Sequence, residues 1–311
     1  MNFISAQKIR KNIKLNSLIS EIENIYINDS NVPLRQVYNI TPKNNSDQMM
    51  LMPAFSNEGY YGVKLLNIFE NNPLIGLPRI NALYILYKRK NGDILATLDG
   101  TEITKQRTSA MSAIASKFLS KKDSKKLLVL GTGALVSYMI NAHCSVRPIE
   151  DILIWGRNTN KVQKIVKSYK NSNYNVSSVD CLEDACGIAD IITSVTSSKK
   201  EFIKGAWLNK FVHIDLVGAH TKEMAELDPY GFSLGEIYVD DKEAVLFEAG
   251  DLINSIKLGF INKKDIKADI KQLIIDNKIK RNNKNKITIY KSVGNALSDL
   301  ATAIYLFKRL K

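Results

Sequence analysis

Residues 127–134 read Leu-Leu-Val-Leu-Gly-Thr-Gly-Ala. The first four of these residues are typical of a buried strand, and the two glycines lead into a helix predicted to end at about residue 143. Such a turn lets the backbone approach a pyrophosphate, which then lies at the N-terminus of the helix. The third glycine of this fingerprint is missing, because position 136 is Val. A plain turn between a strand and a helix is therefore the alternative interpretation.

The segments that follow favour the nucleotide-binding interpretation, because short apolar strands continue to alternate with helices. Further strands are predicted at 152–155, 175–179, 190–195, 211–217 and 287–290. One helix is predicted to end at about residue 169, a second to span about 250–280, and a last one to begin at 292. This alternation is typical of a parallel sheet covered by helices on both faces. We therefore predict an α/β fold with a Rossmann-type doubly wound parallel sheet.

The first 120 residues or so show a different, mixed pattern. We predict a helix at 5–27, a strand at 48–53, strands at 82–87 and 94–98 around the hairpin turn Asn91-Gly92, and a helix from the cap Thr104 to Leu119. The polar segment 121–126 marks a domain boundary, and we expect the last helix to pack back on the first domain. The prediction is a discontinuous α+β domain, 1–122 with 291–311, around a Rossmann domain, 123–290.

Composition limits the classes of protein to consider. The 311 residues are 45% hydrophobic and 24% charged, which excludes a disordered chain, a collagen-like repeat and a disulfide-rich scaffold. No apolar run reaches the roughly 18 residues of a membrane helix. The N-terminal residues lack the apolar core of a secretory signal. We therefore expect a cytoplasmic protein with no membrane partner.

The formal net charge of +13 points to an anionic partner. Most of the 44 basic residues are lysines scattered along the chain, and their densest group, 278–286, contains no aromatic residue. This pattern does not favour nucleic acid. An anionic small substrate or cofactor explains the sign of the charge equally well, and we expect that class of ligand.

Cysteine, histidine and serine residues give no sign of a metal site or a hydrolase. Cys144, Cys181 and Cys186 form no CxxC pair, and the three histidines have no metal-ligand spacing. No GxSxG motif occurs, which counts against an α/β-hydrolase triad. Free thiols in a reducing compartment and no metal are expected.

The end of the second predicted strand indicates which cofactor binds. A site for NAD usually carries Asp or Glu there, to bind the ribose 2′-hydroxyl. This chain instead reads Ile154-Trp155-Gly156-Arg157-Asn158, and Asp151 is at the opposite end of the strand. Arg157 can pair with a 2′-phosphate. We predict NADPH in preference to NADH, the alternative being an exposed arginine without a role.

Several segments together resemble the ornithine cyclodeaminase/μ-crystallin family over nearly the whole chain. They are residues 32–35, 51–54, 62–64, 98–108, 131–134, 143–148, 154–157, 215–219 with 226, 250–251 and 291–294. Met52-Pro53-Ala54 and the His-x-x-Val-Arg-Pro segment at 143–148 are most similar to the Δ1-pyrroline-2-carboxylate (ketimine) reductase branch.

The resemblance implies an oxidoreductase that uses NADPH or NADH to reduce a cyclic imino acid, Δ1-pyrroline-2-carboxylate or Δ1-piperideine-2-carboxylate, to proline or pipecolate. It also implies a homodimer, in which the discontinuous domain binds the substrate and the Rossmann domain binds the cofactor. The implied residues are Arg35, Met52, Lys64 and Arg107 for the substrate, Lys64, Arg107 and His220 for catalysis, and Gly131, Thr132, Gly133, Ala134, Arg157, Thr196, Val217, Gly218 and Ser292 for the cofactor.

The position of Arg107 in the sequence also points to a bound anion, independently of the resemblance. It follows the expected cap Thr104 by three residues, which places a cation in the first turn of a helix, where it opposes the macrodipole. An anion bound at that helix start would offset the repulsion. Each residue also has a simpler explanation without a substrate. Arg107 can be an arginine that extends to solvent, and Lys64 can be a lysine at a strand edge.

One departure from the family pattern separates the activities that the resemblance allows. Cyclodeaminases carry an Asp after the fifth strand, where it handles the substrate amine, and His220 stands at that position here. A largely neutral imidazole holds an ammonium poorly near pH 7. Reduction of a preformed imine is therefore favoured over ornithine deamination. A dehydrogenase of an open-chain amino acid and a non-catalytic, crystallin-like NADPH-binding protein are also consistent with these residues.

Overall fold

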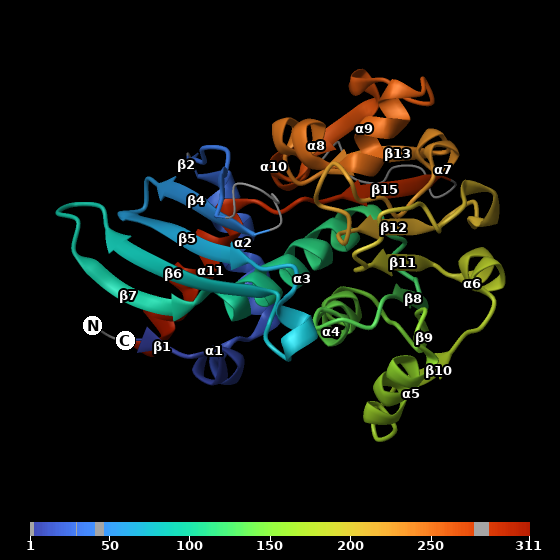
Figure 1. Ribbon diagram of the computed structural model, residues 1–311, viewed down its shortest axis with the longest axis horizontal. Coiled ribbons are helices and arrows are strands. Elements are labelled where there is room, and N and C mark those ends of the chain that lie inside the picture. Colours follow the sequence, from blue (N-terminus) through green and yellow to red (C-terminus); the bar gives the residue numbers. More distant parts are fainter. Residues whose placement is uncertain (1–2, 29, 41–46, 277–285) are drawn as a thin grey trace. The chain divides into compact units, whose positions relative to one another are not determined.

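The computed structural model describes residues 3–28, 30–40, 47–276 and 286–311. The chain forms two compact units (Figure 1). Unit 1 comprises residues 1–110 and 295–311, and unit 2 comprises residues 111–294. The assignment of a substrate domain to 1–122 with 291–311 and of a cofactor domain to 123–290 stays a prediction.

Unit 1 is built on one twisted, mainly antiparallel sheet. Its strand order is β1-β7-β6-β5-β4-β2, with β3 also paired to β4. The strands are β1 (Phe3–Ile4), β2 (Ser30–Asn31), β3 (Gln36–Asn39), β4 (Gln48–Ser56), β5 (Tyr60–Ile68), β6 (Ile80–Lys88) and β7 (Ile94–Asp99). The helical elements are α1 (Ala6–Asn12), α2 (Leu15–Ile27), η1 (Asn72–Ile75), the start of α3 (Gly100–Leu119) and α11 (Ala296–Leu310).

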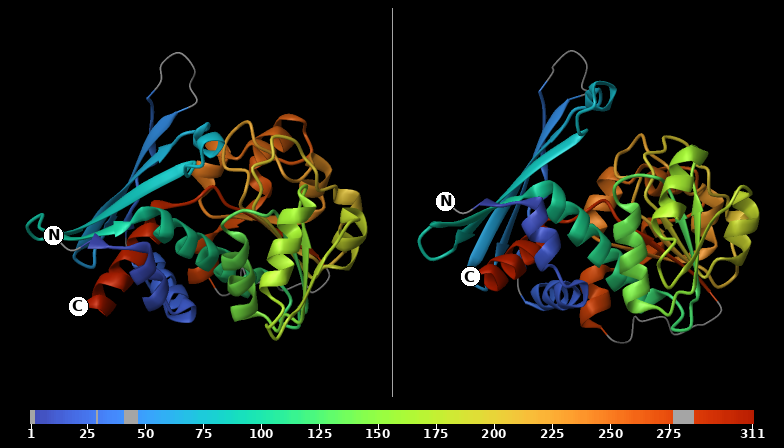
Figure 2. Two further views of the ribbon diagram at one scale, coloured as in Figure 1. Left: turned by 60° about the horizontal axis from the view of Figure 1, so that its bottom comes forward. Right: turned by 90° about the horizontal axis from the view of Figure 1, so that it is seen from below.

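Helices α2 and α11 pack against each other, and α11 crosses strands β4 to β7 on one face of the sheet (Figure 2). Side chains of β4 and β5 alternate in burial, as expected for strands with one covered face. Buried residues of α2, such as Leu18 and Ile22, and of α11, such as Leu300 and Ile304, fill the space against that face. The last helix therefore closes the core of the unit in which the chain begins.

Two predictions for unit 1 were wrong in detail. The helix expected at 5–27 is two helices, because the backbone is extended at Ile13 and Lys14. Thr104 does not cap the next helix, since α3 begins at Gly100 and Asp99 Oδ1 accepts the N–H of Glu102 at 2.8 Å. The hairpin at Asn91-Gly92 is confirmed, with Gly92 at φ 77°.

Unit 2 is a fully parallel eight-stranded sheet of order β10-β9-β8-β11-β12-β15-β13-β14. The strands are β8 (Lys126–Leu130), β9 (Asp151–Trp155), β10 (Asn175–Ser178), β11 (Ile191–Ser194), β12 (His213–Leu216), β13 (Gly235–Val239), β14 (Ile266–Asp269) and β15 (Ile287–Lys291). The helices are the end of α3, α4 (Val136–Val146), α5 (Thr159–Ser168), α6 (Leu182–Ile188), η2 (Gly205–Trp207), α7 (Pro229–Ser233), α8 (Lys242–Glu248), α9 (Gly250–Lys257), η3 (Lys263–Asp265) and α10 (Ile270–Ile275).

The central strand β8 shows how the sheet is covered on both faces. Leu127 and Val129 pack with α4 and α5 residues in one apolar cluster, whereas Leu128 and Leu130 pack in a second cluster with α6 and α8 residues. Successive side chains of a strand point to opposite faces, so a strand buried on both sides is apolar throughout. The predicted Rossmann-type doubly wound sheet is confirmed.

The helix expected at 250–280 was wrong, because it contains a strand. Helix α9 ends at Lys257, and β14 pairs with β13 at the edge of the sheet before α10 begins. The last residues of the expected helix, 277–280, lie outside the described residues. Among the described helices, none is long and apolar enough to cross a membrane.

Candidate functional site

Unit 1 holds a buried cluster of charged side chains, Lys64, Arg107 and Asp299. The Asp299 carboxylate accepts from both cations: Oδ2 lies 2.7 Å from Lys64 Nζ, and Oδ1 lies 3.0 Å from Arg107 Nε. The exposed fraction of the side chain is 1% for Lys64, 7% for Arg107 and 0% for Asp299. Removing charges from water is costly even when they are paired, and apolar packing would serve stability as well. Stability alone therefore does not account for these buried charges, and the cluster is a candidate functional site.

The register of the sheet explains why Lys64 lies in this cluster. Lys64 falls on the buried face of β5, directly opposite Met52 on β4 and Tyr84 on β6. Opposite residues of neighbouring strands share one face, so the three side chains form a row across the sheet. Asp299 reaches Lys64 from the first turn of α11. Two of the predicted substrate residues, Lys64 and Met52, are thereby neighbours.

The pKa of Lys64 is set by its burial and its charged neighbours. Burial lowers it from the usual value of 10.5 to about 7; Asp299 raises it, and the positive charges of Arg107 and Arg35 lower it. Arg35 lies in the loop between β2 and β3 and is partly exposed. An amine with a pKa near neutrality can donate a proton to a bound substrate. Lys64 thus has the chemistry of a general acid.

Arg107 presents the rest of its guanidinium to a ligand. Only Nε is bonded to Asp299, and within the described part of the chain the terminal nitrogens donate no hydrogen bond. The planar fork of a guanidinium matches a carboxylate. Lys64 and Arg107 share the one carboxylate of Asp299, and the charge of Arg35 also acts on Lys64. The excess positive charge attracts an anion.

The structure overturns the helix-dipole argument for Arg107. Because α3 begins at Gly100, Arg107 lies about two turns inside the helix, where the macrodipole acts weakly. Thr104 donates its hydroxyl to the carbonyl oxygen of Gly100 at 2.8 Å and is an interior residue. The partner that accounts for Arg107 is Asp299, which sequence reasoning missed. The available signal was the one acidic residue of the last helix, which stands among mostly apolar and small residues.

Tyr84 contributes a buried hydroxyl with no hydrogen-bond partner among the described residues. Burial, reinforced by the charge of Asp299, raises the pKa of this phenol well above its usual value, so the proton is retained. The ring passes over Gly62, where an added Cβ would lie 2.7 Å from Tyr84 Cε1. An unsatisfied buried polar group costs about 1–3 kcal/mol. Tyr84 is therefore a candidate for bonding a ligand.

The expected pyrophosphate turn in unit 2 follows the carboxyl end of β8. Gly131 has φ 129°, a conformation that side chains rarely allow. Gly133 and Ala134 are exposed, and a Cβ added to Gly133 would meet no atom within 4 Å. Thr132 is half-buried, and α4 begins just beyond at Val136. This open backbone before a helix fits the pyrophosphate of a nicotinamide dinucleotide.

The end of β9 carries no acid, as the sequence indicated. Asp151 is the first residue of the strand and accepts a hydrogen bond from Asn175 Nδ2 at 3.0 Å, at the opposite end from the turn. Arg157 is exposed beyond the carboxyl end. Asn158 caps α5, with Oδ1 3.0 Å from Lys161 N. Arg157 is therefore placed where the ribose of the cofactor lies in Rossmann folds.

Glu226, to which sequence reasoning gave no role, ties together the loops after β11 and β12. Its Oε1 accepts from Thr196 N at 3.0 Å and Thr196 Oγ1 at 2.8 Å. Its Oε2 accepts from the N–H groups of Gly218 at 2.9 Å and Ala219 at 3.0 Å. Burial raises the pKa of Glu226. Two predicted cofactor residues, Thr196 and Gly218, are thus fixed by one carboxylate at the carboxyl edge of the sheet.

The remaining predicted residues of unit 2 lie at the same edge. Val217 follows β12 and donates its N–H to Ser194 O at 3.0 Å. His220 is partly exposed, and its Nδ1 donates to Gly218 O at 2.8 Å. Ser292 follows β15, is buried and donates its hydroxyl to Asp240 Oδ2 at 2.8 Å. Their contacts with a cofactor or substrate stay predictions.

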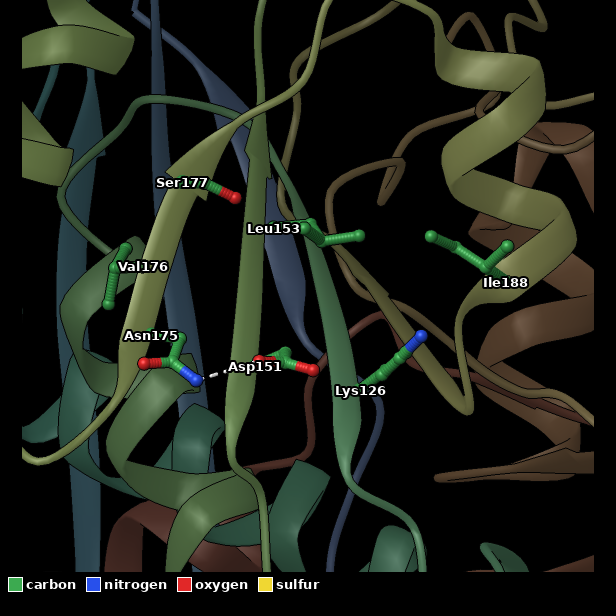
Figure 3. Close-up of a pocket in the computed structure, with 7 residues that line it drawn as sticks. All are labelled: Lys126, Asp151, Leu153, Asn175, Val176, Ser177 and Ile188. Carbon is green, nitrogen blue, oxygen red and sulfur yellow. Dashed lines mark hydrogen bonds between the residues drawn. The ribbon is translucent and has the colours of Figure 1, made fainter.

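A separate pocket of about 390 Å³ in unit 2 is shown in Figure 3. Lys126, Asp151 and Asn175 line it, and each is the first residue of its strand. Ligands of parallel sheets bind at the carboxyl ends of the strands. This pocket is therefore distinct from the expected cofactor site. Within the described ranges, no group of three or more His, Cys, Asp or Glu residues could hold a metal ion.

Known proteins are similar to this chain over nearly its whole length. The model of the ornithine cyclodeaminase/mu-crystallin family matches residues 2–311. A Delta(1)-pyrroline-2-carboxylate reductase of Colwellia psychrerythraea is 34% identical, over all of this chain and 99% of its own length.

Two solved structures share the whole fold. That of Thermococcus litoralis Delta(1)-pyrroline-2-carboxylate reductase with NADH and L-proline has a TM-score of 0.94 and 30% identity, covering 99% of this chain and 97% of that one. An archaeal alanine dehydrogenase dimer with bound NAD has a TM-score of 0.91 and 26% identity, covering 99% and 95%. Because the family model matches nearly every residue and a 34% identical relative covers the whole chain, this chain belongs to the ornithine cyclodeaminase/mu-crystallin family.

Proposed function

We propose that this protein is an NAD(P)H-dependent imine reductase that converts Δ1-pyrroline-2-carboxylate or Δ1-piperideine-2-carboxylate to proline or pipecolate. The observation that carries the proposal is the buried cluster of Lys64 and Arg107 with Asp299, beside Arg35. It offers an excess of positive charge and a proton donor to a small anion. The Colwellia and Thermococcus reductases, similar along their whole lengths, support this substrate class.

The residues of unit 1 would act as follows. The free edge of the Arg107 guanidinium, together with Arg35, binds the substrate carboxylate and fixes the orientation of the ring. The Lys64 ammonium supplies the proton that makes the ring nitrogen an iminium, the better hydride acceptor. When bound, the reduced nicotinamide supplies the hydride that becomes the new C–H bond. The product nitrogen keeps the proton as an amine.

The residues of unit 2 would hold that cofactor. The turn at 131–134 binds the pyrophosphate, and the loops held by Glu226, with Thr196, Val217 and Gly218, border the nicotinamide half. Ser292 is also proposed to border the nicotinamide half of the cofactor. Arg157, exposed with no acid beside it, favours the 2′-phosphate of NADPH. The complex of the Thermococcus relative contains NADH, so the proposed preference for NADPH rests on this chain's own residues alone.

The proposal also covers the oligomeric state of the protein and the compartment in which it works. We expect a homodimer, as in the archaeal alanine dehydrogenase. The three cysteines are free thiols, which fits the cytoplasm.

The test is a substrate panel with purified protein and either NADPH or NADH, followed by loss of the reduced cofactor's absorbance. The five- and six-membered cyclic imines should be reduced. Pyruvate with ammonia tests the open-chain alternative, because the similar alanine dehydrogenase supports that activity as the second candidate. If none of the imines causes the reduced cofactor to be consumed, the protein only binds the cofactor, and the proposal is contradicted.

A further inference from the structure

Building on the proposed imine reduction, we propose that Asp299 is a positioning residue that keeps Lys64 protonated and aims the guanidinium of Arg107 at the substrate carboxylate. It touches neither substrate nor cofactor in this scheme. Its two oxygens are divided between the two cations, Oδ2 with Lys64 Nζ and Oδ1 with Arg107 Nε. One side chain therefore fixes both the acid and the carboxylate binder.

The geometry determines which edge of Arg107 stays available. A guanidinium can pair with a carboxylate through Nε and one terminal nitrogen, or through both terminal nitrogens. Because Asp299 takes Nε at 3.0 Å, the edge formed by the two terminal nitrogens remains for the substrate. Asp299 is completely buried, and its backbone lies in the first turn of α11, whose Asn295 cap fixes the helix start. The carboxylate thus has little freedom to leave either partner.

The charges around Lys64 show why this carboxylate matters for the proton. The groups that face Lys64 are Asp299 on α11, Arg107 on α3 and Arg35 before β3, with the neutral phenol of Tyr84 opposite it on β6. Asp299 is the one anion among them, whereas both arginines and the burial favour the neutral amine. Removal of this charge should therefore make Lys64 lose its proton at lower pH.

A purely structural ion pair is the competing explanation. Such a pair would affect the stability of unit 1 when broken, but it would not move the pH dependence of catalysis. The discriminating variants are Asp299→Asn, which keeps the shape and removes the charge, and Asp299→Glu, which keeps the charge and lengthens the side chain.

The experiment measures kcat/KM for the cyclic imine against pH, because this quantity reports the ionisation of the free enzyme. In the wild type, activity should fall on the alkaline side of a pKa of about 7. In Asp299→Asn, this alkaline limb should move to lower pH by roughly one unit, and kcat/KM at pH 7 should fall about fivefold. In Asp299→Glu, the limb should stay in place while KM for the imine rises several-fold. An unmoved limb in Asp299→Asn would overturn the proposal.

A second measurement is independent of turnover. The protein is labelled with [ε-13C]lysine, the Lys64 resonance is assigned by its loss in Lys64→Arg, and its shift is followed against pH by NMR. The Lys64 midpoint should fall in Asp299→Asn. Asp251→Asn is the matched control, because it removes a buried carboxylate 3.0 Å from the Nζ of a different buried lysine, Lys291, and should leave the Lys64 midpoint unchanged.

The outcomes separate the two proposals. If the wild type reduces no imine but the Lys64 midpoint follows Asp299 in the NMR titration, the proposed function fails and the electrostatic role of Asp299 holds. If imines are reduced but neither the limb nor the midpoint responds to Asp299→Asn, Asp299 is only a structural partner. If Asp299→Asn does not fold, Asp299→Glu decides, because an unchanged KM in that variant would overturn the role in aiming Arg107.

Discussion

At the scale of single residues, the two buried cations of the candidate site are paired with an acid far away in the sequence. The residues Lys64 and Arg107 were predicted from the family resemblance, since their spacing alone also fits an edge lysine and an exposed arginine. Asp299 was not predicted, because it lies 235 and 192 residues from its two partners. Only the packing of the last helix on the sheet brings it to them. Pairing across such distances leaves no spacing pattern in the sequence, and the one acidic residue of the last helix does not by itself indicate its partners.

The role of Arg107 can be tested by truncation. Arg107→Ala should lower kcat/KM for the cyclic imine about a hundredfold, because a charge-assisted pair with the carboxylate is lost. Binding of NADPH, measured by fluorescence or calorimetry, should be retained, since the residues proposed to bind the cofactor belong to unit 2. Arg309→Ala, at an exposed position near the end of α11, is the matched control and should keep full activity. Activity within a few-fold of wild type in Arg107→Ala would make this arginine a structural cation.

Tyr84 offers a test in which stability and activity separate. Its hydroxyl has no hydrogen-bond partner within the described residues, so Tyr84→Phe should leave the free energy of unfolding unchanged or raise it by about 1 kcal/mol. If the hydroxyl bonds the substrate, KM for the imine should rise about tenfold. Tyr305→Phe is the contrast, because that hydroxyl accepts the N–H of Lys14 at 3.2 Å and its loss should destabilise. Urea unfolding and steady-state kinetics measure the two effects, and an unchanged KM in Tyr84→Phe would remove the residue from the site.

At the scale of secondary-structure elements, the strands of unit 2 that flank the dinucleotide turn were predictable, and those at the far edge were not. Strands such as β8 and β11 are short, largely apolar and bounded by polar residues, which is a strong local signal. Strand β14 reads Ile-Lys-Ala-Asp between helical segments, and it becomes a strand by pairing with β13. Strand β5 was likewise not predicted, because glycine and lysine interrupt its apolar pattern, although those two residues are the ones that lie at the candidate site.

The loop after β9 is the element that should determine cofactor choice. Arg157→Ala should weaken NADPH binding about tenfold and leave NADH binding nearly unchanged, because only NADPH carries the 2′-phosphate. The matched control is Lys164→Ala, an exposed cation of the following helix α5, which should alter neither affinity. Dissociation constants for both cofactors, measured by titration, are the readout. Equal affinity of the wild type for the two cofactors would show that Arg157 has no such role.

At the scale of the whole molecule, one sequence specifies two sheets of opposite kind, and each kind suits its task. An antiparallel sheet covered by helices on one face places alternate side chains in a row, and that row carries Lys64. A parallel sheet brings every carboxyl end to one edge, where backbone N–H groups and loops gather to bind a dinucleotide. The family resemblance predicted this combination, and composition alone did not, since the charge and apolar content fit many α/β proteins.

The distinction between reduction and deamination concerns the activity of the whole protein and turns on His220. Its Nδ1 donates to the carbonyl oxygen of Gly218, so the ring is held in the loop after β12 at the position where cyclodeaminases carry an acid. A neutral imidazole provides much less field for a substrate ammonium than a carboxylate does. The wild type with NAD should therefore release no ammonia from ornithine, whereas the same preparation with NADPH should reduce Δ1-pyrroline-2-carboxylate. His220→Asp should retain imine reduction to a measurable extent and gain a trace of ornithine turnover, measured as ammonia release. Release of ammonia from ornithine by the wild type, at the rate of imine reduction, would instead establish the cyclodeaminase activity and show that the residue at position 220 does not decide between the two.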